Sequence, residues 1–220
     1  MGAITNILLS KASGVARYFG VTVGDSTNEI EIIDSITGLN AIIKDFRCST
    51  AYNDINLTLV PQTAGAAIPA TIAFNGDTIL KCIAFSGTNI TPDELPSSLE
   101  VLHDYKEGTD IEFHVHWYPI NTTVANVKWQ LRYSWFNKNG AAAAGATAFV
   151  ISAASGVAWQ EQTAVITLSG TGKLMGSRLV FSLFRDATDA ADTYAFNAAV
   201  TDMGLHYQRD SLGSRTQGAK

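Results

Sequence analysis

Residues 109–119 read TDIEFHVHWYP, and this segment decides the fold class because apolar and polar side chains alternate through it without a break. In a β-strand, successive residues point to opposite faces, so the apolar half of the segment would share one face. A helix would scatter both halves around its axis, because its period is 3.6 residues. The alternation therefore predicts a half-buried strand. Its inward set is Ile111, Phe113, Val115 and Trp117, and its outward set is Glu112, His114, His116 and Tyr118.

The segment VKWQLRYSWFN, residues 127–137, repeats this pattern after the polar turn INTTVAN. Both segments have nine or more residues, which is long for a strand, and two strands separated by that turn are expected. The inward set of the second strand is Val127, Trp129, Leu131, Tyr133 and Trp135, and the outward set is Lys128, Gln130, Arg132 and Ser134. The outward set is expected to face solvent.

Shorter apolar or alternating segments extend the β pattern in both directions. They are residues 79–85, 159–168, 179–184 and 201–207. The segment LVFSLF (179–184) is almost continuously apolar, which predicts a strand covered on both faces.

Loops separate these strands. Residues 86–98 contain Pro92 and Pro96, and residues 137–148 are rich in alanine, so both segments are expected on the surface. About eight strands without βαβ alternation are typical of an all-β jelly roll or a related antiparallel β-sandwich. This domain is predicted to cover residues 66–220.

Residues 1–65 are expected to form an N-terminal arm or a small attachment unit. The first twenty residues mix apolar and polar positions, which predicts a short amphipathic helix or an arm that becomes ordered on a partner. Residues 55–60 alternate well enough for one strand, and residues 61–70, PQTAGAAIPA, have the composition of a linker. The early apolar run is too short for a signal h-region, so synthesis in the cytoplasm without a cleaved export signal is expected.

The chain carries few charges for a protein of 220 residues: 16% are charged, whereas about 25% is typical. A surface with few charges is desolvated at low cost, which suits a protein covered by neighbouring subunits. The 15 lysines and arginines are scattered and the net charge is −5, so direct nucleic-acid binding is not expected. No apolar run approaches the ~20 residues of a membrane span. Cys48 and Cys82 are expected to be buried thiols.

The pair His114 and His116 is the sharpest candidate for chemistry. Two histidines two apart on a strand share a face, about 7 Å apart at their Cα atoms, and can share a metal. Cupins use such an H-x-H pair with a glutamate three or four residues later, but residues 117–120 here read WYPI. His103 or His206 could supply a third ligand, although nothing in the sequence joins either to the pair. The favoured interpretation is two polar residues on an outer or interface face that bind no metal tightly.

A second group of possible ligands is Asp186, Asp189 and Asp192 in the loop DATDAADT. They lack the D-x-D-x-D-G spacing and closing glutamate of an EF-hand, so solvated turn residues are favoured over a calcium site. Arg185, just before this loop, is expected to pair with Asp186, Asp189 or a neighbouring subunit. The chain has no G-x-S-x-G, P-loop or G-x-G-x-x-G motif. No catalytic residue, cofactor or enzymatic activity is expected.

Four blocks of the sequence occur together and in order. They are SLEVLHDYKEGTDIEFHVHWYP (98–119), VKWQLRYSWFN (127–137), LFRDATDAADTY (183–194) and LHYQRDSLGSR (205–215). In these blocks, over about half its length, the chain resembles a family of virion proteins of tailed bacteriophages. Members share a YKEG…H-x-H-W block, a W-x-L-x-Y-x-W strand, an LFRD strand and a closing HYQ-D-x-x-GSR. The family has no catalytic residues to transfer.

The resemblance implies a virion structural protein, since members are described as capsid decoration, head-fibre or tail-associated proteins. The favoured function is a capsid decoration or cement protein, assembled in the host cytoplasm as a homotrimer. Its partners would be copies of itself and the major capsid protein or another virion protein, with the N-terminal portion on the shell. The alternative is a tail-fibre or receptor-binding module that recognises host surface glycan. A third hypothesis is a cupin-like metal-binding protein, against which the missing glutamate counts.

Overall fold

The computed structural model describes residues 6–8, 18–20, 51–59 and 67–209, and all regular structure within these ranges is β-strand. The strands are β1 (Asn6–Leu8), β2 (Tyr18–Gly20), β3 (Ala51–Leu57), β4 (Ala70–Phe74), β5 (Asp77–Phe85), β6 (Asp93–Glu100), β7 (Ile111–Pro119), β8 (Asn126–Phe136), β9 (Ala146–Ala153), β10 (Gln162–Leu168), β11 (Arg178–Arg185) and β12 (Ala198–Arg209). The strands β1 and β2 pair with each other. Nine strands, β4 to β12, lie in the predicted β domain, where the sequence suggested about eight.

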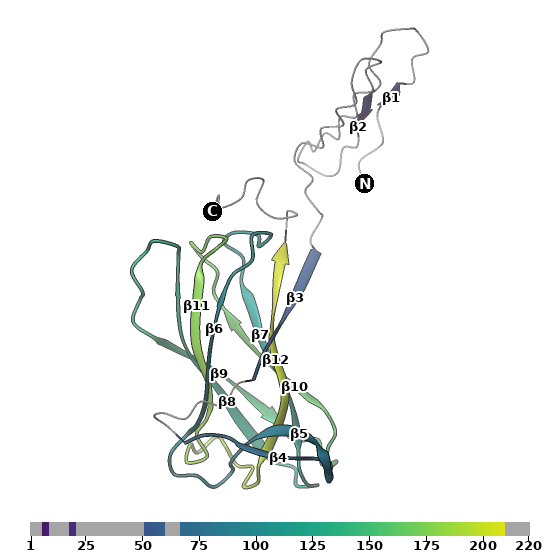
Figure 1. Cartoon of the computed structure of the whole chain (residues 1–220), viewed down its shortest axis with the longest axis vertical. Coiled ribbons are helices and arrows are strands. Elements are labelled where there is room, and N and C mark those ends of the chain that lie inside the picture. The colour runs from purple at the N-terminus through teal and green to yellow at the C-terminus, as the bar shows by residue number, and fades with distance from the viewer. Residues whose placement is uncertain (1–5, 9–17, 21–50, 60–66, 210–220) are drawn as a thin grey trace.

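The strands β3 to β12 form two antiparallel sheets that face each other (Figure 1). One sheet has the order β10-β7-β12-β5-β4, with β3 also paired to β12, and the other has the order β6-β11-β8-β9. Phe113 of β7 and Phe181 of β11 meet between the sheets, with ring centroids 5.3 Å apart. The prediction of an all-β antiparallel sandwich is therefore confirmed.

The strands β7 and β8 supply the centre of the core, as their alternation predicts. Trp117 and Trp129 are completely buried, and their ring centroids lie 6.1 Å apart. Phe85, at the end of β5, meets Trp129 edge to face at 5.1 Å. Such contacts add about 0.5–1.5 kcal/mol each beyond the buried area, so the three rings form a strong anchor between the sheets.

The strand β12 runs through the middle of the larger sheet. On one side it pairs with β7, and on the other side with β5 over residues 198–200 and with β3 over residues 203–209. A bulge between Val200 and Asp202 separates these two halves. The strand β3 was assigned to the N-terminal unit 1–65, and it pairs here with the β domain. Most of that unit lies outside the described residues, so the proposed division of the chain stays a prediction.

Two of the predicted surface loops contain strands. Residues 86–98 include most of β6, with Pro96 opposite Ser182 of β11. Proline has no backbone N–H to donate, and it is tolerated here because β6 has β11 as its only neighbour in the described sheet. The alanine-rich segment 137–148 is a loop as far as residue 145, and β9 begins at Ala146.

Two predictions of burial were also wrong. The strand β11 is covered on one face only, because Val180 is 49% exposed while Leu179 is fully buried. The outward set of β8 is only partly solvated. Gln130 is 8% exposed, and the ammonium group of Lys128 pairs with Asp189 and lies 4.6 Å from the ring centre of Phe149.

A buried arginine joins the two sheets. Arg185, 1% exposed at the end of β11, pairs with Asp192 through Nε (2.8 Å) and Nη2 (2.7 Å). It also donates to the backbone carbonyls of Phe85, Tyr194 and Phe196. All five N–H donors of the guanidinium group are thereby used. The predicted partners of Arg185 were wrong, because two successive turns in the loop bring Asp192 back to it.

Tyr207 of β12 gives the fold a testable pH dependence. Its hydroxyl donates to Asp104 and accepts from Asn53, and burial is the main cause that raises its pKa from 10 to about 12. The folded state therefore favours the neutral phenol, and this contribution is present below pH 10 and lost as the pH rises towards 12. We expect the wild type to lose more unfolding free energy than Tyr207→Phe between these pH values, as measured by urea unfolding. Equal losses would contradict the assignment.

Cys82 is a buried free thiol, as predicted, and burial raises its pKa. Cys48 lies outside the described residues. No helix in the described ranges is long and apolar enough to cross a membrane.

Candidate functional site

Histidines and carboxylates gather on the outer face of the larger sheet, where β3, β12, β7 and β10 lie in register. Three of the four histidines of the chain lie there: His114, His116 and His206. The carboxylates around them are Asp54, Glu112, Glu161 and Asp202. The group draws on strands that are far apart in the sequence, and β12 brings them together.

His114 is buried although it points to the outer face. Its neighbours in sequence fill the core, and its own ring is only 1% exposed. Gly204 lies opposite on β12, and a Cβ there would stand 2.7 Å from Nε2 of His114. A glycine at this position therefore lets the ring lie against the backbone of β12.

Neither ring nitrogen of His114 has a hydrogen-bond partner within the described part of the chain. A buried polar group without a partner costs about 1–3 kcal/mol, so such a group usually has a compensating interaction. Burial lowers the pKa of His114, and the neighbouring His206 lowers it further. The ring is therefore held in the neutral form that binds a cation or another donor.

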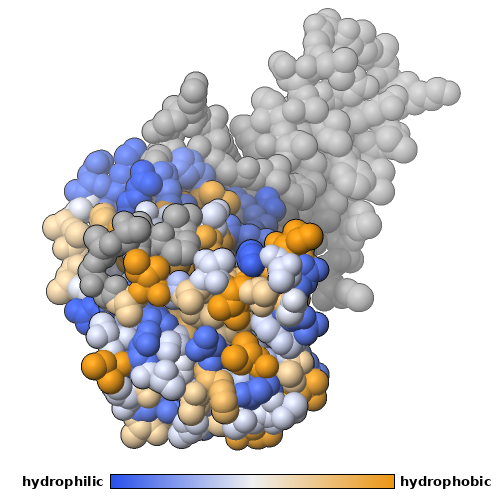
Figure 2. Space-filling view, turned by 60° about the horizontal axis from the view of Figure 1, so that its bottom comes forward, coloured by the Kyte–Doolittle hydropathy of each residue, from blue (hydrophilic) through white to orange (hydrophobic). Residues whose placement is uncertain are grey.

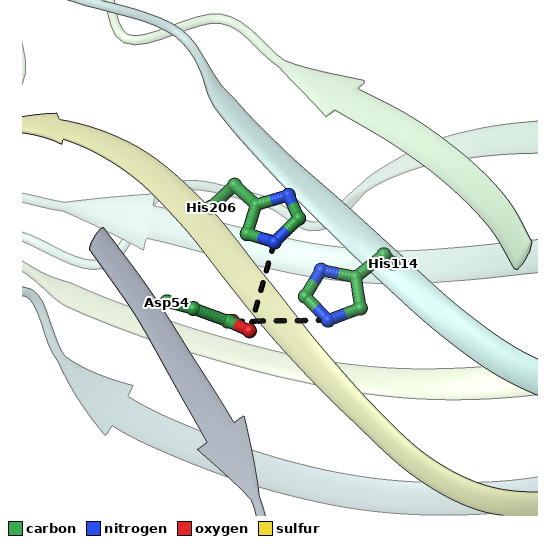
Figure 3. A group of neighbouring side chains, drawn as sticks. All are labelled: Asp54, His114 and His206. Carbon is green, nitrogen blue, oxygen red and sulfur yellow. Dashed lines mark ion pairs between the residues drawn. The ribbon is translucent and has the colours of Figure 1, made fainter. Parts of the chain in front are cut away.

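Asp54 and His206 complete a compact group with His114 (Figure 3). The Nε2 atom of His114 lies 3.7 Å from Oδ1 of Asp54, and the Nε2 atom of His206 lies 3.6 Å from Oδ2. The ring centroids of the two histidines are 4.3 Å apart. Asp54 and His206 are about half exposed, at 46% and 44%, so the group opens to solvent on one side.

His116 belongs to a separate network. Its Nδ1 atom lies 3.0 Å from Glu161, and its Nε2 atom lies 3.7 Å from Asp202. Tyr118 donates to the other oxygen of Glu161 at 2.9 Å. Hydrogen bonds from Tyr118 and His116 lower the pKa of Glu161. His116 thus has polar partners of its own on the outer face.

The structure groups the predicted candidates differently from the H-x-H pattern. His114 and His116 do share the outer face, but their rings stand at 80° to each other and have different partners. The ring of His206 lies next to that of His114, whereas His103 contacts Glu100 and is not part of this group. Asp54 was not a candidate, because nothing in the local sequence connects β3 with β7.

The aspartate triplet does not form one cluster. Asp192 is buried against Arg185, Asp189 pairs with Lys128, and Asp186 accepts hydrogen bonds from Thr188. The prediction of solvated turn residues was therefore wrong for Asp192. Each carboxylate is engaged in holding the loop.

A shallow hollow of about 220 Å³ lies beside the Asp54 group on the same face. Its lining combines one exposed aromatic ring with hydroxyl, amide, carboxylate and imidazole groups. These residues are Tyr52, Thr109, Asp110, Glu112, Thr167, His206 and Gln208. The hollow offers a ring face and several hydrogen-bonding groups to a polar ligand.

Comparison with known proteins gives no family. No family model and no curated protein matches the chain. Among solved structures, the arabinose-bound α-L-arabinofuranosidase MgGH51 is 9% identical with a TM-score of 0.36, over 74% of this chain and 25% of that one. The CBM22-1–GH10 modules of Clostridium thermocellum xylanase 10B, bound to xylohexaose, are 9% identical with a TM-score of 0.33, over 80% and 30%.

A third solved structure is the mannan-recognising carbohydrate-binding module TmCBM27. It is 12% identical with a TM-score of 0.31, over 70% of this chain and 98% of that one. The chain spans only about a quarter to a third of the first two proteins. Similarity at this level carries no conclusion about ligand or activity.

Proposed function

We propose that the chain is a non-catalytic structural protein of a tailed-phage virion, a capsid decoration protein that assembles with copies of itself on the shell. The proposal joins the four sequence blocks to what their residues do in the fold. A decoration protein needs a rigid folded body, surface for neighbours and a means of attachment. The sandwich supports the first of these, its exposed apolar side chains support the second, and attachment is proposed for the N-terminal stretch.

The observation that carries the proposal is that aromatic residues from all four blocks meet in one core. Tyr105 of the first block lies 6.1 Å from Trp135 of the second and 6.3 Å from Tyr207 of the fourth, between ring centroids. Tyr194 of the third block lies 6.3 Å from Trp117 of the first. The blocks that carry the resemblance are therefore the framework of the sandwich. A resemblance carried by core residues favours a shared fold rather than a shared catalytic activity.

Apolar side chains on the surface of the sandwich offer area for neighbours. Phe149 and Ile151, 58% and 45% exposed, stand on the outer face of the smaller sheet. At the end of the molecule that carries β4 and β5, apolar and polar patches are interspersed (Figure 2). Ile79, Leu80 and Ile90 are 56–88% exposed, and Ile79 and Leu80 belong to β5. Apolar surface of this kind supports packing against other subunits.

Removing residues 1–20 should separate attachment from folding. We expect the truncated protein to remain a folded, soluble oligomer that no longer joins particles. The two strands of this stretch, β1 and β2, pair with each other and with no described strand of the sandwich, and the stretch has few apolar residues of its own to bury. The intact protein should bind shells that lack it. The measurement is co-sedimentation with shells of a phage that encodes the chain, with shells already carrying the protein as the control.

The outcomes separate the hypotheses. Full binding of the truncated form would place attachment in the β domain and contradict the assigned role of residues 1–20. Binding of intact protein to host cells and not to shells would overturn the decoration proposal and favour the receptor-binding alternative.

Glycan recognition is the second candidate function, and the hollow beside Asp54 favours it. Sugars bind to exposed aromatic rings flanked by carboxylates and amides, and Tyr52, Glu112 and Gln208 offer these groups together. Tyr52 is 71% exposed, so its ring is open to stacking. If this function holds, free protein should block infection by occupying the receptor.

A further inference from the structure

We propose that Asp54, His114 and His206 form a binding site for a divalent transition-metal cation of the Zn²⁺ type. This goes beyond the proposed function and is independent of it. The site differs from the H-x-H pair of the sequence, because His116 is engaged with Glu161 and takes no part.

The distances suit a tetrahedral cation. Zinc bonds of about 2.0–2.2 Å to nitrogen and oxygen place neighbouring tetrahedral ligands roughly 3.3–3.5 Å apart. The carboxylate of Asp54 lies 3.7 Å from Nε2 of His114 and 3.6 Å from Nε2 of His206. All three ligand atoms lie within 4.8 Å of one another. The two distances to the carboxylate exceed ligand spacing by only a few tenths of an ångström.

The buried ring of His114, whose nitrogens have no hydrogen-bond partner among the described residues, points to a ligand between it and Asp54. Its ring is held against β12 by the space that Gly204 leaves, and its Nε2 atom faces Asp54 at a distance too long for a hydrogen bond. A cation between the three residues would satisfy this buried nitrogen and leave Nδ1 to carry the ring proton.

The surrounding charge favours a cation over an anion. Glu112 lies opposite His206 on β7, and Asp202 lies on the same outer face of β12, two positions before Gly204. No lysine or arginine is among the outward residues of β3, β7 and β12 that surround the site. Since Asp54 and His206 are half exposed, a fourth ligand would be water or a group from a binding partner.

The test is metal binding by protein purified without a histidine tag and treated with EDTA. Titration with Zn²⁺ alone, measured by isothermal titration calorimetry, should give one ion per chain with a Kd at or below about 1 μM. His206→Ala and Asp54→Ala should each weaken binding by more than about 100-fold. A loss of that size exceeds the loss expected for a residue that only orients a ligand without touching the metal. Both side chains are half exposed, so the variants should keep the fold, which circular dichroism checks.

His116→Ala is the matched control, because it removes a histidine of the same face that packs edge-on against His114, with centroids 5.0 Å apart, but offers no ligand atom to the group. Its Kd should equal that of the wild type. Substitution with Co²⁺ should give visible absorption bands of a four-coordinate ion, which disappear in His206→Ala. Less than one ion per chain, binding that survives in both ligand variants, or an equal loss in His116→Ala would overturn the proposal.

Discussion

Replacing Arg185 with methionine is expected to lower the free energy of unfolding by about 3–5 kcal/mol, the usual loss when one partner of a buried ion pair is removed. The carboxylate of Asp192 would stay in the interior without its counter-charge, since its side chain is 1% exposed. The carbonyls of Phe85, Tyr194 and Phe196 would also lose their donors. Urea unfolding of the two proteins measures the difference.

Arg178→Met is the control for this experiment. Arg178 lies on the same strand and pairs with Glu100 at 2.9 Å, but it is 53% exposed. An exposed pair contributes about 1 kcal/mol or less, so this variant should unfold close to the wild type. Equal losses in Arg178→Met and Arg185→Met would contradict the role given to the buried network. The double variant Arg185→Met with Asp192→Leu should lose less than the sum of the single changes, because the two residues are coupled.

Trp129→Ala should have an effect of similar size. It removes a fully buried ring that contacts Phe85 and Trp117, and such truncations cost about 3–5 kcal/mol. Arg132→Ala, on the same strand with an exposed side chain, should change the unfolding free energy by about 0.5 kcal/mol or less. Lys128 of the same strand would be an unsuitable control, because it is paired with Asp189. Equal unfolding midpoints for the two variants would contradict the register of β8.

The sandwich could be predicted where a strand has one face in the core. The segments around Trp117 and Trp129 alternate strictly, so sequence alone gave both the strand and its inward face. The strand β6 was missed because Pro92 and Pro96 are typical of loops. An edge strand tolerates proline, however, because an N–H that faces away from the sheet forms no ladder bond.

The candidate site could be predicted only in part. Alternation places His114 and His116 outward, but the partners of His114 come from β3 and β12. Pairing between distant strands leaves no local trace, so neither Asp54 nor the choice of His206 over His103 could be derived. One trace was present: Gly204 interrupts an alternating strand, and a glycine there often marks a close approach of another group.

The buried ion pair shows the same limit on a shorter scale. The sequence suggested that Arg185 pairs with its nearest aspartates, Asp186 or Asp189. Two turns, closed by hydrogen bonds from Asp189 to Asp186 and from Asp192 to Asp189, fold the loop back and present Asp192 instead. The two turns therefore decide that Arg185 pairs with Asp192, seven residues further along the chain.

The central claim is that the chain is a capsid decoration protein, and its copy number in the virion tests this most directly. Quantitative mass spectrometry of purified particles, with the major capsid protein as internal standard, gives the ratio of the two chains. The proposal predicts a fixed ratio in which this chain is comparable in abundance with the shell protein, and an oligomer on the shell surface in images of the same particles. A few copies confined to the tail, or absence from the particle, would contradict it.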